Sequence, residues 1–423
     1  GPTSSITVPA HNNPYTAMPT LSGTASDNDA GGNRAGINPG DVKVSVRDLY
    51  SGKYWDGGVG FNSGAEAFFA AAGTAAWTYS DTTLSAGYAS GRKYLVRVQA
   101  RDAAAPVNIQ PELLPSVTYT IDTTAPVSSA TFPGNGNFQQ PFSTLSGTAV
   151  DALPATVPVS TGTGVAGLSL VDVELKNVTD TFYWTGSSWT ANPAWARAGG
   201  TSAWTLAVAS ATIWTDGKQY SVRARARDAV ANVETPAPAV TFRIDASTPT
   251  STIYPPVSGS FYNAALTAIG GNASDPSAGT ASGVNRVRVS LYRSAPTTGY
   301  WNTSAFAAAT EYFHQAASTN PWTWTAPAFT EGNYTVHAVA EDNAVPGVNV
   351  ETPGPVSNFT YDVTAPVSTV TAPANGAKLA APPAVSGTAT DNSGAPGLSL
   401  VQVSVKDQQE GKWWNGSTFT ATL

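Results

Sequence analysis

The chain of 423 residues has a net charge of −7 and no cysteine, with charged residues at 12% and aromatic residues at 10%. The negative charge without a basic cluster argues against nucleic-acid binding, and the lack of cysteine excludes disulfides, thiolate metal sites and thiol nucleophiles. No apolar run is long enough to span a membrane, and the first residues lack a signal-peptide pattern. The length favours about three or four domains with aromatic-rich cores.

Four landmarks recur in the same order along the chain, which indicates internal repeats. The first is a short segment ending in Asp, of the type Ser-Gly-Thr-Ala-x-Asp, at residues 21–27, 145–151, 269–275 and 385–391. The second is a strictly alternating apolar run at residues 42–46, 171–175, 287–291 and 401–405. Such alternation predicts a strand with one face in a core and the other in water.

The third landmark is an aromatic pair a few residues later: Tyr54-Trp55, Tyr183-Trp184, Tyr300-Trp301 and Trp413-Trp414. The fourth is a strand–loop–strand unit whose first strand reads Tyr-x-Val-x-Ala/Val-x-Ala-x-Asp and begins at residues 94, 220 and 334. Its alternate residues are predicted to face a core, and the residues between them, three arginines in the second copy, to face solvent. The closing strands lead to Asp122, Asp245 and Asp362.

Seven or so short strands in a repeat of about 120 residues predict an all-β fold, a tandem array of two-sheet antiparallel β-sandwich domains. The predicted domains are residues 1–122, 123–245, 246–362 and an incomplete fourth repeat, 363–423. Each joint is three residues long and ends in Pro126, Pro249 or Pro366. Because proline restricts the chain, we expect the domains to align end to end in an elongated rod. The chain starts within a joint, so we expect an excerpt of a longer polypeptide.

Two alanine-rich insertions follow the aromatic pairs of the first and third repeats, at residues 65–76 and 304–318. Gly73 and the polar flanks break any helical period. These insertions are therefore predicted to be loops.

The motifs together resemble the bacterial immunoglobulin-like repeats of large exported surface proteins, and the resemblance covers essentially the whole chain. It rests on Ser-Gly-Thr-Ala-x-Asp, the Val-x-Val-x-Val run, the Tyr-x-Val-x-Ala-x-Ala-x-Asp strand and the Phe-x-Ile-Asp-x-x-x-Pro joint. The resemblance implies stalks, adhesins, surface filaments or spacers of secreted enzymes. The chain departs from antibody domains in having no cysteine pair.

The recurring aspartates are candidate metal ligands. In an immunoglobulin-like sandwich the loops after the second and sixth strands lie at the pole where the preceding domain enters, so three carboxylates are expected to converge at a joint. The predicted groups are Asp122, Asp151 and Asp228; Asp245, Asp275 and Asp342; the incomplete pair Asp362 and Asp391; and the pair Asp27 and Asp102. Oxygens of Asn232 and Asn349 are candidate additional ligands. Hard oxygen ligands suit Ca²⁺. The alternative is that each Asp caps a turn.

The aromatic pairs are candidate ligand-binding residues, because neighbouring residues on a strand point to opposite faces and one ring of each pair should face outward. Trp55, Trp184, Trp301 and Trp414 are therefore predicted to stack on surface glycans or a neighbouring domain. The alternative is that they pack in the core or cover an insertion. Asn-x-Ser/Thr sequences occur at positions 177, 272, 302, 333, 358 and 415, and they are frequent by chance in such a chain.

No catalytic residue is predicted. Of the three histidines, His337 takes an outward strand position, His11 lies in a loop and His314 in an insertion. We expect a non-catalytic rod or stalk segment of an extracellular or cell-surface bacterial protein. Its expected partners are neighbouring repeats and, in addition, other copies in a filament or surface glycans. The alternatives are a binding module that uses exposed aromatics and the insertions at 61–76 and 302–320, and spacer repeats of a secreted hydrolase.

Overall fold

The computed structural model describes residues 1–27, 32, 34–111, 114–208, 213–264, 266–277, 279–392 and 397–421. The regular structure of these residues is almost entirely β-strand, and α1 (Thr82–Gly87) is a short helix. The chain divides into two compact units, residues 1–244 and 245–423. The predicted repeat boundaries at residues 122, 245 and 362 remain predictions, and the four repeats serve below as names for stretches of chain.

The strands of the first repeat are β1 (Pro2–Val8), β2 (Asn13–Tyr15), β3 (Leu21–Asp27), β4 (Val42–Asp48), β5 (Tyr54–Trp55), β6 (Phe61–Ser63), β7 (Phe69–Ala70), β8 (Ala72–Gly73), β9 (Ala76–Tyr79), β10 (Arg92–Ala100) and β11 (Ser116–Ile121). Those of the second are β12 (Val127–Phe132), β13 (Phe138–Gln139), β14 (Thr144–Val150), β15 (Leu168–Asn177), β16 (Phe182–Trp184), β17 (Trp189–Thr190), β18 (Ala196–Arg197), β19 (Ala203–Ala207), β20 (Gln219–Asp228) and β21 (Val240–Ile244). The third has β22 (Thr250–Ser251), β23 (Ser260–Tyr262), β24 (Ala268–Gly271), β25 (Ala273–Ser274), β26 (Val284–Ala295), β27 (Gly299–Trp301), β28 (Phe306–Ala308), β29 (His314–Gln315), β30 (Trp322–Thr325), β31 (Gly332–Asp342) and β32 (Val356–Tyr361). The fourth has β33 (Val367–Ala372), β34 (Ser386–Thr390), β35 (Trp413–Trp414) and β36 (Phe419–Thr420).

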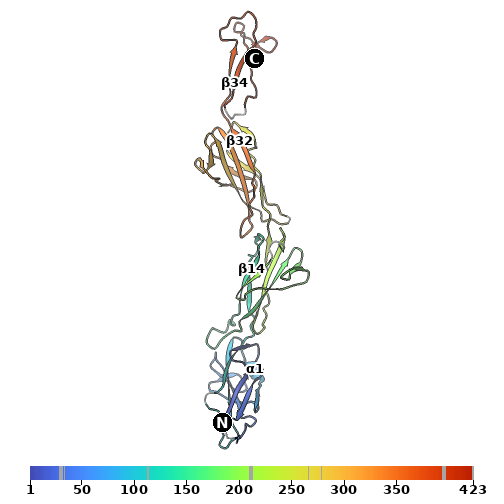
Figure 1. Cartoon of the computed structure of the whole chain (residues 1–423), viewed down its shortest axis with the longest axis vertical. Helices are drawn as coiled ribbons and strands as arrows, with labels where there is room; N and C mark the ends of the chain where they lie inside the picture. The colour runs from blue at the N-terminus through green and yellow to red at the C-terminus, as the bar shows by residue number, and fades with distance from the viewer. Residues whose placement is uncertain are drawn as a thin grey trace. The chain divides into compact units, whose positions relative to one another are not determined.

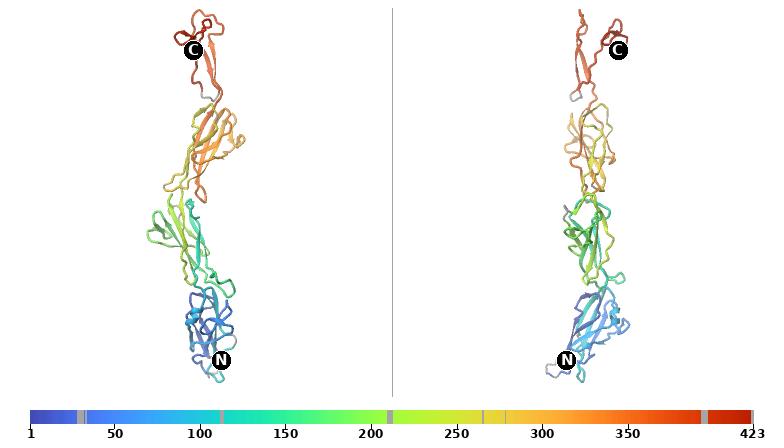
Figure 2. Two further views of the ribbon diagram at one scale, coloured as in Figure 1. Left: turned by 180° about the vertical axis from the view of Figure 1, so that it is seen from behind. Right: turned by 90° about the vertical axis from the view of Figure 1, so that its right-hand side faces the viewer.

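The same two-sheet arrangement recurs in the first three repeats. One sheet of the first repeat has the order β1-β3-β9-β8, and the other has the order β2-β11-β10-β4-β5-β6. The second repeat has β12-β14-β19 and β13-β21-β20-β15-β16-β17, and the third has β22-β25, β24-β30 and β23-β32-β31-β26-β27-β28 (Figures 1 and 2). In each larger sheet a short early strand pairs in parallel with the closing strand, and the other pairings are antiparallel. This is the predicted immunoglobulin-like sandwich.

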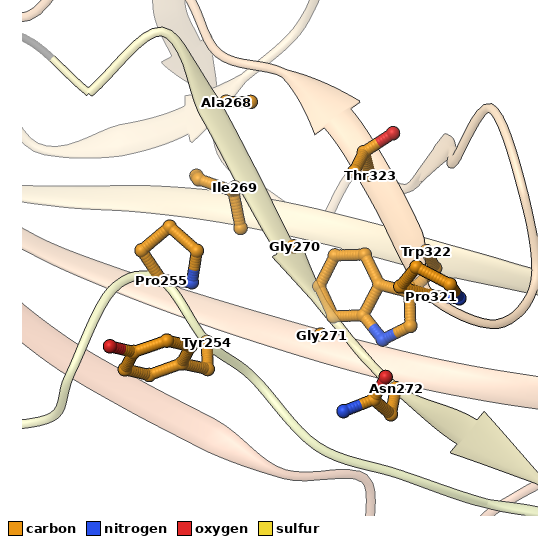
Figure 3. A pocket seen from close by; sticks show the side chains of 10 residues that line it. All are labelled: Tyr254, Pro255, Ala268, Ile269, Gly270, Gly271, Asn272, Pro321, Trp322 and Thr323. Carbon is orange, nitrogen blue, oxygen red and sulfur yellow. The ribbon is translucent and has the colours of Figure 1, made fainter.

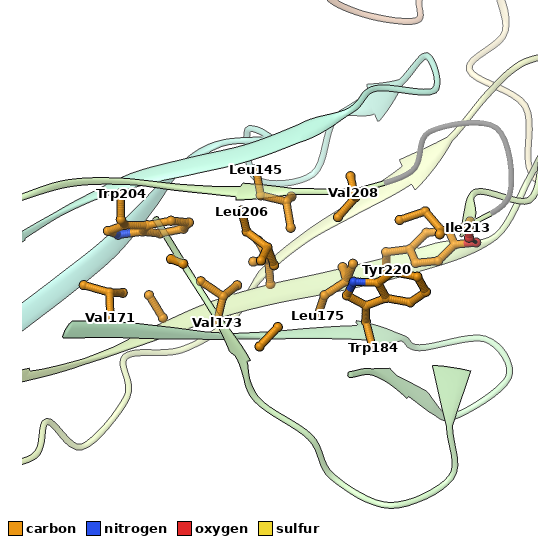
Figure 4. Close-up of a cluster of buried hydrophobic side chains, with 14 of the residues drawn as sticks. Leu145, Val171, Val173, Leu175, Trp184, Trp204, Leu206, Val208, Ile213 and Tyr220 are labelled. Atoms are coloured by element: carbon orange, nitrogen blue, oxygen red, sulfur yellow. Dashed lines mark hydrogen bonds between the residues drawn. The ribbon is translucent and has the colours of Figure 1, made fainter. Parts of the chain in front are cut away.

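The alternating strands place one face of each sheet in a core, as predicted. In the second repeat Tyr220, Val222 and Ala226 of β20 have no exposed surface, and Val173 and Leu175 of β15 pack with them (Figure 4). The first and third repeats have equivalent clusters drawn from residues 18–121 and 269–359. Each cluster therefore belongs to a single stretch of the repeat pattern, which is what a series of separate sandwiches requires.

The glycine of the Ser-Gly-Thr-Ala motif permits a close approach of strand and tryptophan. A Cβ on Gly147 would lie 2.0 Å from the carbonyl oxygen of Ser129 and 2.2 Å from the ring of Trp204. The indole N–H of Trp204 donates to the carbonyl oxygen of Thr148 at 3.2 Å, next to that glycine. Gly23 and Trp77 repeat both contacts. A Cβ on Gly271 would lie 2.9 Å from the Trp322 ring, but the indole N–H of Trp322 donates to the carbonyl oxygen of Thr252 instead. The motif thus fixes a tryptophan across the smaller sheet.

The prediction that the two insertions are loops was wrong in part. Residues 65–76 contain β7 and β8, and residues 304–318 contain β28 and β29. β7 pairs with β4 and β29 with β26, so each insertion folds back onto a central strand. A strand without a neighbour presents unpaired N–H and C=O groups, and these short pairings satisfy some of them.

The helix α1 was not predicted. Asp81 caps it by accepting hydrogen bonds from the N–H groups of Thr83 and Leu84.

The fourth repeat leaves its alternating run uncovered. Val401, Val403 and Val405 are 51%, 60% and 39% exposed, whereas their counterparts in the first three repeats are buried. The strands that hold the counterparts, β4, β15 and β26, pair with β10, β20 and β31. No equivalent of those three partner strands occurs among the described residues of the fourth repeat. In the part of the chain that the structure describes, no helix is long and apolar enough to cross a membrane.

Candidate metal centres

Three aspartates from separate strand ends converge within the unit 1–244. Asp122 follows β11, Asp151 follows β14 and Asp228 ends β20. One carboxylate oxygen from each residue lies within 4.8 Å of the others. The grouping matches the one predicted from the order of strands, because the ends of the second and sixth strands share a pole with the entering chain.

The unit 245–423 contains a second group of the same kind. Asp245 begins the unit, Asp275 follows β25 and Asp342 ends β31, and one oxygen from each lies within 4.8 Å of the others. We call the two groups the Asp122 triad and the Asp245 triad. Asp122, Asp228, Asp245 and Asp342 are buried, while Asp151 and Asp275 are partly exposed.

An asparagine orients one carboxylate of each triad. Asp228 accepts hydrogen bonds at Oδ1 from the N–H groups of Val230 and Asn232, and at Oδ2 from the Asn232 side-chain amide at 2.7 Å. The same amide nitrogen donates to the carbonyl oxygen of Asp122 at 3.0 Å. Asn349 makes the corresponding contacts to Asp342 and Asp245. The two asparagines therefore position the triads through their amide nitrogens. Metal ligation by their amide oxygens stays a prediction.

The Asp245 triad holds carboxylate oxygens that lack a partner. Asp245 has no exposed surface, and its Oδ2 accepts the N–H of Ser282 at 2.7 Å. Its Oδ1 is buried and has no hydrogen-bond partner among the described residues, and the same holds for Oδ1 of Asp275 and of Asp151. Burying a carboxylate oxygen without a partner is costly. A cation or a hydrogen-bond donor placed beside these unpartnered carboxylate oxygens would therefore stabilise the triad.

The electrostatics of both triads also favour a bound cation. Burial, together with the charges of Asp245 and Asp342, raises the pKa of Asp275 to about 6. Burial and the charges of Asp122 and Asp228 raise the pKa of Asp151 to about 6 in the same way. Like charges held together in this manner repel one another in the absence of a counter-ion.

The chemistry of the donor set suits a hard divalent cation. Each triad offers carboxylate oxygens only, with no imidazole or thiolate in the group. Ca²⁺ accepts six to eight oxygen ligands in irregular geometry, and Mg²⁺ takes oxygen in stricter geometry with retained waters. The residues present therefore fit an alkaline-earth ion whose remaining ligands are waters or backbone carbonyl groups.

The other predicted aspartates do not form triads among the described residues. Asp27 accepts the N–H of Gly36 at 3.1 Å, and Asp102 accepts hydrogen bonds from Ala104 and Asn108 in the manner of a turn. Asp362 and Asp391 line one hollow near the start of the fourth repeat. They accept the N–H groups of Thr364 and Asn392. Turn capping accounts for these contacts.

In the first two aromatic pairs the tryptophan ring faces the core, and a cationic side chain lies over the tyrosine ring. Trp55 and Trp184 are 0% and 5% exposed and belong to the cores, so neither ring offers a face to a glycan, and the prediction of ligand stacking fails for both. Their partners lie under cations: Arg47 is 5.2 Å from the ring centre of Tyr54, and Lys176 is 5.2 Å from that of Tyr183.

The later tryptophans of the pairs differ. Trp301 is partly buried against Phe306, with ring centres 5.1 Å apart, and Trp414 is 43% exposed beside Phe419. Ligand binding at Trp301 and Trp414 stays a prediction.

The histidines hold local structure. His337 Nδ1 lies 2.7 Å from Oε1 of Glu311, and the same oxygen accepts the hydroxyl of the buried Ser290 at 2.5 Å. The carboxylate therefore stands between serine and histidine, whereas nucleophilic catalysis needs the histidine next to the serine. His314 stacks on Trp324 with ring centres 4.9 Å apart and contacts the carbonyl oxygen of Trp301 at 2.9 Å. These contacts fasten the third-repeat insertion to the sandwich.

A shallow hollow lies beside β24 in the third repeat (Figure 3). Trp322 forms one wall and is fully buried, and Tyr254 forms another and is 70% exposed. The N–H of Tyr254 donates to the carbonyl oxygen of Gly270, so the backbone of the hollow is already paired. No charged side chain lines it. The hollow offers little to orient a polar ligand.

Sequence reasoning missed a buried glutamate. Glu234 accepts hydrogen bonds from the N–H and hydroxyl groups of Ser128 and from the N–H of Ala226. Glu351 makes the same three contacts in the third repeat, with Ser251 and Ala340. The signal was present as the repeated sequence Asn-Val-Glu-Thr-Pro at residues 232–236 and 349–353.

No family model and no curated protein matches the chain. Among solved structures it is similar to a tetra-tandem repeat in the extending region of a large adhesion protein, at 18% identity and a TM-score of 0.27, covering 88% of this chain and 76% of that one. Fibronectin(III)-like modules of Clostridium thermocellum CbhA match at 15% identity and a TM-score of 0.27, covering 56% and 94%. A 1.5-MDa bacterial ice-binding adhesin matches at 10% identity and a TM-score of 0.32, covering 85% and 96%. Likenesses this low carry no functional argument. The topology itself defines the chain as a tandem array of immunoglobulin-like sandwiches.

Proposed function

We propose that the chain is a structural segment of an exported bacterial surface, adhesin or filament protein, in which tandem sandwiches form an elongated rod without catalysis. The observation that supports it is the recurrence of the carboxylate triad. Each triad combines the residue after one closing strand with two residues at strand ends of the sandwich that follows in sequence. A site that recurs at successive joints is expected to have a structural role in the array, whereas an active site would be expected in a single repeat.

We further propose that each triad binds one Ca²⁺ ion. The buried and unpartnered Oδ1 of Asp245 supports this proposal, because a cation would supply the charge that its surroundings lack. Burial and repulsion between the carboxylates together raise the pKa values of Asp151 and Asp275, and a bound ion would offset the repulsion. The ion would bind the aspartate that follows a closing strand together with two aspartates of the next sandwich in sequence. It would thereby limit bending at the joint.

Calorimetric titration of the EDTA-treated full chain with CaCl₂ tests the cation. We expect heat of binding, two sites for the two triads, and a rise in melting temperature, since a ligand that binds only the folded state stabilises it. Asp275→Asn should remove one site, and Glu410→Gln, at an exposed position, should remove none. Absence of heat and of any melting shift would exclude the cation and leave the aspartates as turn caps.

The rod itself is tested separately by solution scattering of the full chain. An elongated particle is expected, and a compact one would contradict the structural proposal whatever the calcium result. The alternatives, a glycan- or protein-binding module and a spacer of a secreted hydrolase, make different predictions. A binding module should retain glycans on an array through the exposed Trp414, and a spacer requires a catalytic domain elsewhere in the same polypeptide.

A further inference from the structure

Part of the second repeat leaves its own sandwich and lies against the first repeat. Residues 153–164, which we call the strap, connect Asp151 to β15. The N–H of Lys93 donates to the carbonyl oxygen of Gly162 at 2.8 Å. The N–H of Gly164 donates to the carbonyl oxygen of Gly91 at 3.1 Å. Arg92 and Thr163 form the β-bridge between these two bonds. The strap therefore pairs with the start of β10 as a short additional strand.

Gly162 allows the strap to make this contact. A Cβ on Gly162 would lie 2.5 Å from backbone atoms of both Leu49 and Tyr50 in the first repeat. The backbone of Gly162 is outside the left-handed region, so the glycine is needed for close approach and not for its conformation. Both Gly162 and Thr163 are buried in this contact.

The strap is braced before it reaches the first repeat. The N–H of Val157 donates to the carbonyl oxygen of Pro154 at 2.8 Å, and the N–H of Ser160 donates to the hydroxyl of Thr163 at 2.8 Å. Val157 is buried, whereas Val159 is 90% exposed. A loop with its own hydrogen bonds loses less conformational entropy on docking than a free loop does.

The strap also leads directly into the Asp122 triad. The N–H of Ala166, two residues beyond the strap, donates to Oδ2 of Asp122 at 2.7 Å. Oδ1 of Asp122 accepts the N–H of Thr124 and the hydroxyl of Ser90. Asp122 is therefore satisfied by protein donors, in contrast to Asp245 with its unpartnered oxygen.

The third repeat has no segment as long as the strap at the corresponding place in its sequence. In the third repeat the stretch between Asp275 and Val284 is much shorter than the stretch between Asp151 and Leu168. It has no room for a comparable excursion. The array therefore contains at least one joint with a built-in protein contact and one that lacks this segment.

We infer that the strap locks the first and second repeats in a single orientation through its own contacts, with or without a cation in the Asp122 triad. The two repeats then move as one rigid body. Domain pairs joined only by a linker and a small interface move relative to one another by default. A stiff pair within the array gives the rod a fixed segment that does not depend on the calcium concentration.

Distance measurements by electron paramagnetic resonance on the full chain test this inference. The chain has no cysteine, so Val59→Cys and Ser187→Cys, both at exposed positions, place one spin label in each repeat. In EDTA the distance distribution should be narrow. With Gly162→Val added, it should broaden by about twofold or more, as expected for a joint that has lost the strap contact.

Hydrogen exchange and a control variant complete the experiment. Gly162→Val should raise the exchange rates of the Lys93 and Gly164 amides by about tenfold or more, because their acceptors are lost. The amide of Ala226, in the core of the second repeat, should stay protected and so show that the sandwich is folded. Gly58→Val, at a site with open space, should change neither readout.

Three results would overturn the inference. The first is a distribution that stays narrow in Gly162→Val after the two amides have lost protection. The second is full protection of those amides in the variant. The third is a natural chain that is broad in EDTA and narrow only with Ca²⁺, which would assign the orientation to the cation and leave the proposed calcium site intact.

Discussion

Glu234 joins the two sheets of the second repeat through Ser128. Its Oε1 accepts the N–H of Ser128 at 2.8 Å, and its Oε2 accepts the hydroxyl of the same residue at 2.5 Å. Ser128 lies in β12 of the smaller sheet, and Oε2 also accepts the N–H of Ala226 in β20 of the larger sheet. One buried carboxylate thereby accepts hydrogen bonds from donors on β12 and β20, two strands that do not pair with each other.

Truncating this clamp should destabilise the second repeat. Glu234→Ala leaves the amide groups of Ser128 and Ala226 buried without acceptors, which costs about 1–3 kcal/mol for each group. Glu234→Gln should cost clearly less, because Gln110 fills the equivalent position in the first repeat and accepts hydrogen bonds from Ser4 and Ala100. Urea unfolding followed by tryptophan fluorescence measures the difference. Equal losses in the two variants would refute the clamp.

Gly147→Ala should be among the most damaging single-methyl changes in the chain. The added Cβ would meet a backbone oxygen at 2.0 Å and the Trp204 ring at 2.2 Å, and neither neighbour has room to retreat. Overpacking a close-packed interior typically costs about 1–3 kcal/mol, and a backbone clash places this variant at the upper end. Gly58→Ala, in open space, is the matched control. Thermal unfolding with near-ultraviolet circular dichroism compares them, and equal melting temperatures would contradict the prediction.

The sequence was sufficient for the fold because its strands have period two and its landmarks recur. Val173 and Tyr220 are buried where alternation placed them, and the order of strands brought Asp151 and Asp228 to one pole. Convergence of the triads was predictable for the same reason, since only topology was needed. Whether they bind Ca²⁺ stays a proposal.

Features that depend on unequal segments were not predictable. The strap carries no periodic pattern, and its contacts depend on where Gly162 meets the backbone of Leu49. The inward rotation of Trp55 and Trp184 was also open, because alternation shows that two neighbours face opposite ways but not which one faces the core. The role of Glu234 lay in a repeated motif, but a carboxylate in a β-sandwich is expected at the surface.

In EDTA the chain should become more stable as the pH falls from 7 to 5. The folded-state pKa values of Asp151 and Asp275 are raised to about 6, so between their ordinary pKa of 3.8 and about 6 the folded chain holds more protons than the unfolded chain. Stability therefore declines as pH rises through that window. Carboxylates with lowered pKa, such as Asp102 and Glu331, have the opposite effect but act at lower pH.

Melting temperatures at pH 5, 6 and 7 in EDTA measure this trend. The double variant Asp151→Asn/Asp275→Asn should have a flatter profile, because the two groups responsible no longer titrate. Glu410→Gln should retain the natural profile, since Glu410 lies outside both triads and pairs with the exposed Lys412. A natural chain that loses stability from pH 7 to pH 5 in EDTA would show that the triad carboxylates do not repel one another as described.

Asp245→Asn should have opposite effects with and without Ca²⁺. In EDTA the change removes one of three crowded negative charges, while the remaining amide oxygen still accepts the N–H of Ser282, so the melting temperature should rise. With saturating Ca²⁺ the same change removes a ligand charge, weakens binding and reduces the gain in melting temperature. The two melting curves of the variant and the natural chain should therefore exchange order on adding Ca²⁺. A variant less stable in both conditions would show that Asp245 is needed for its hydrogen bonds alone.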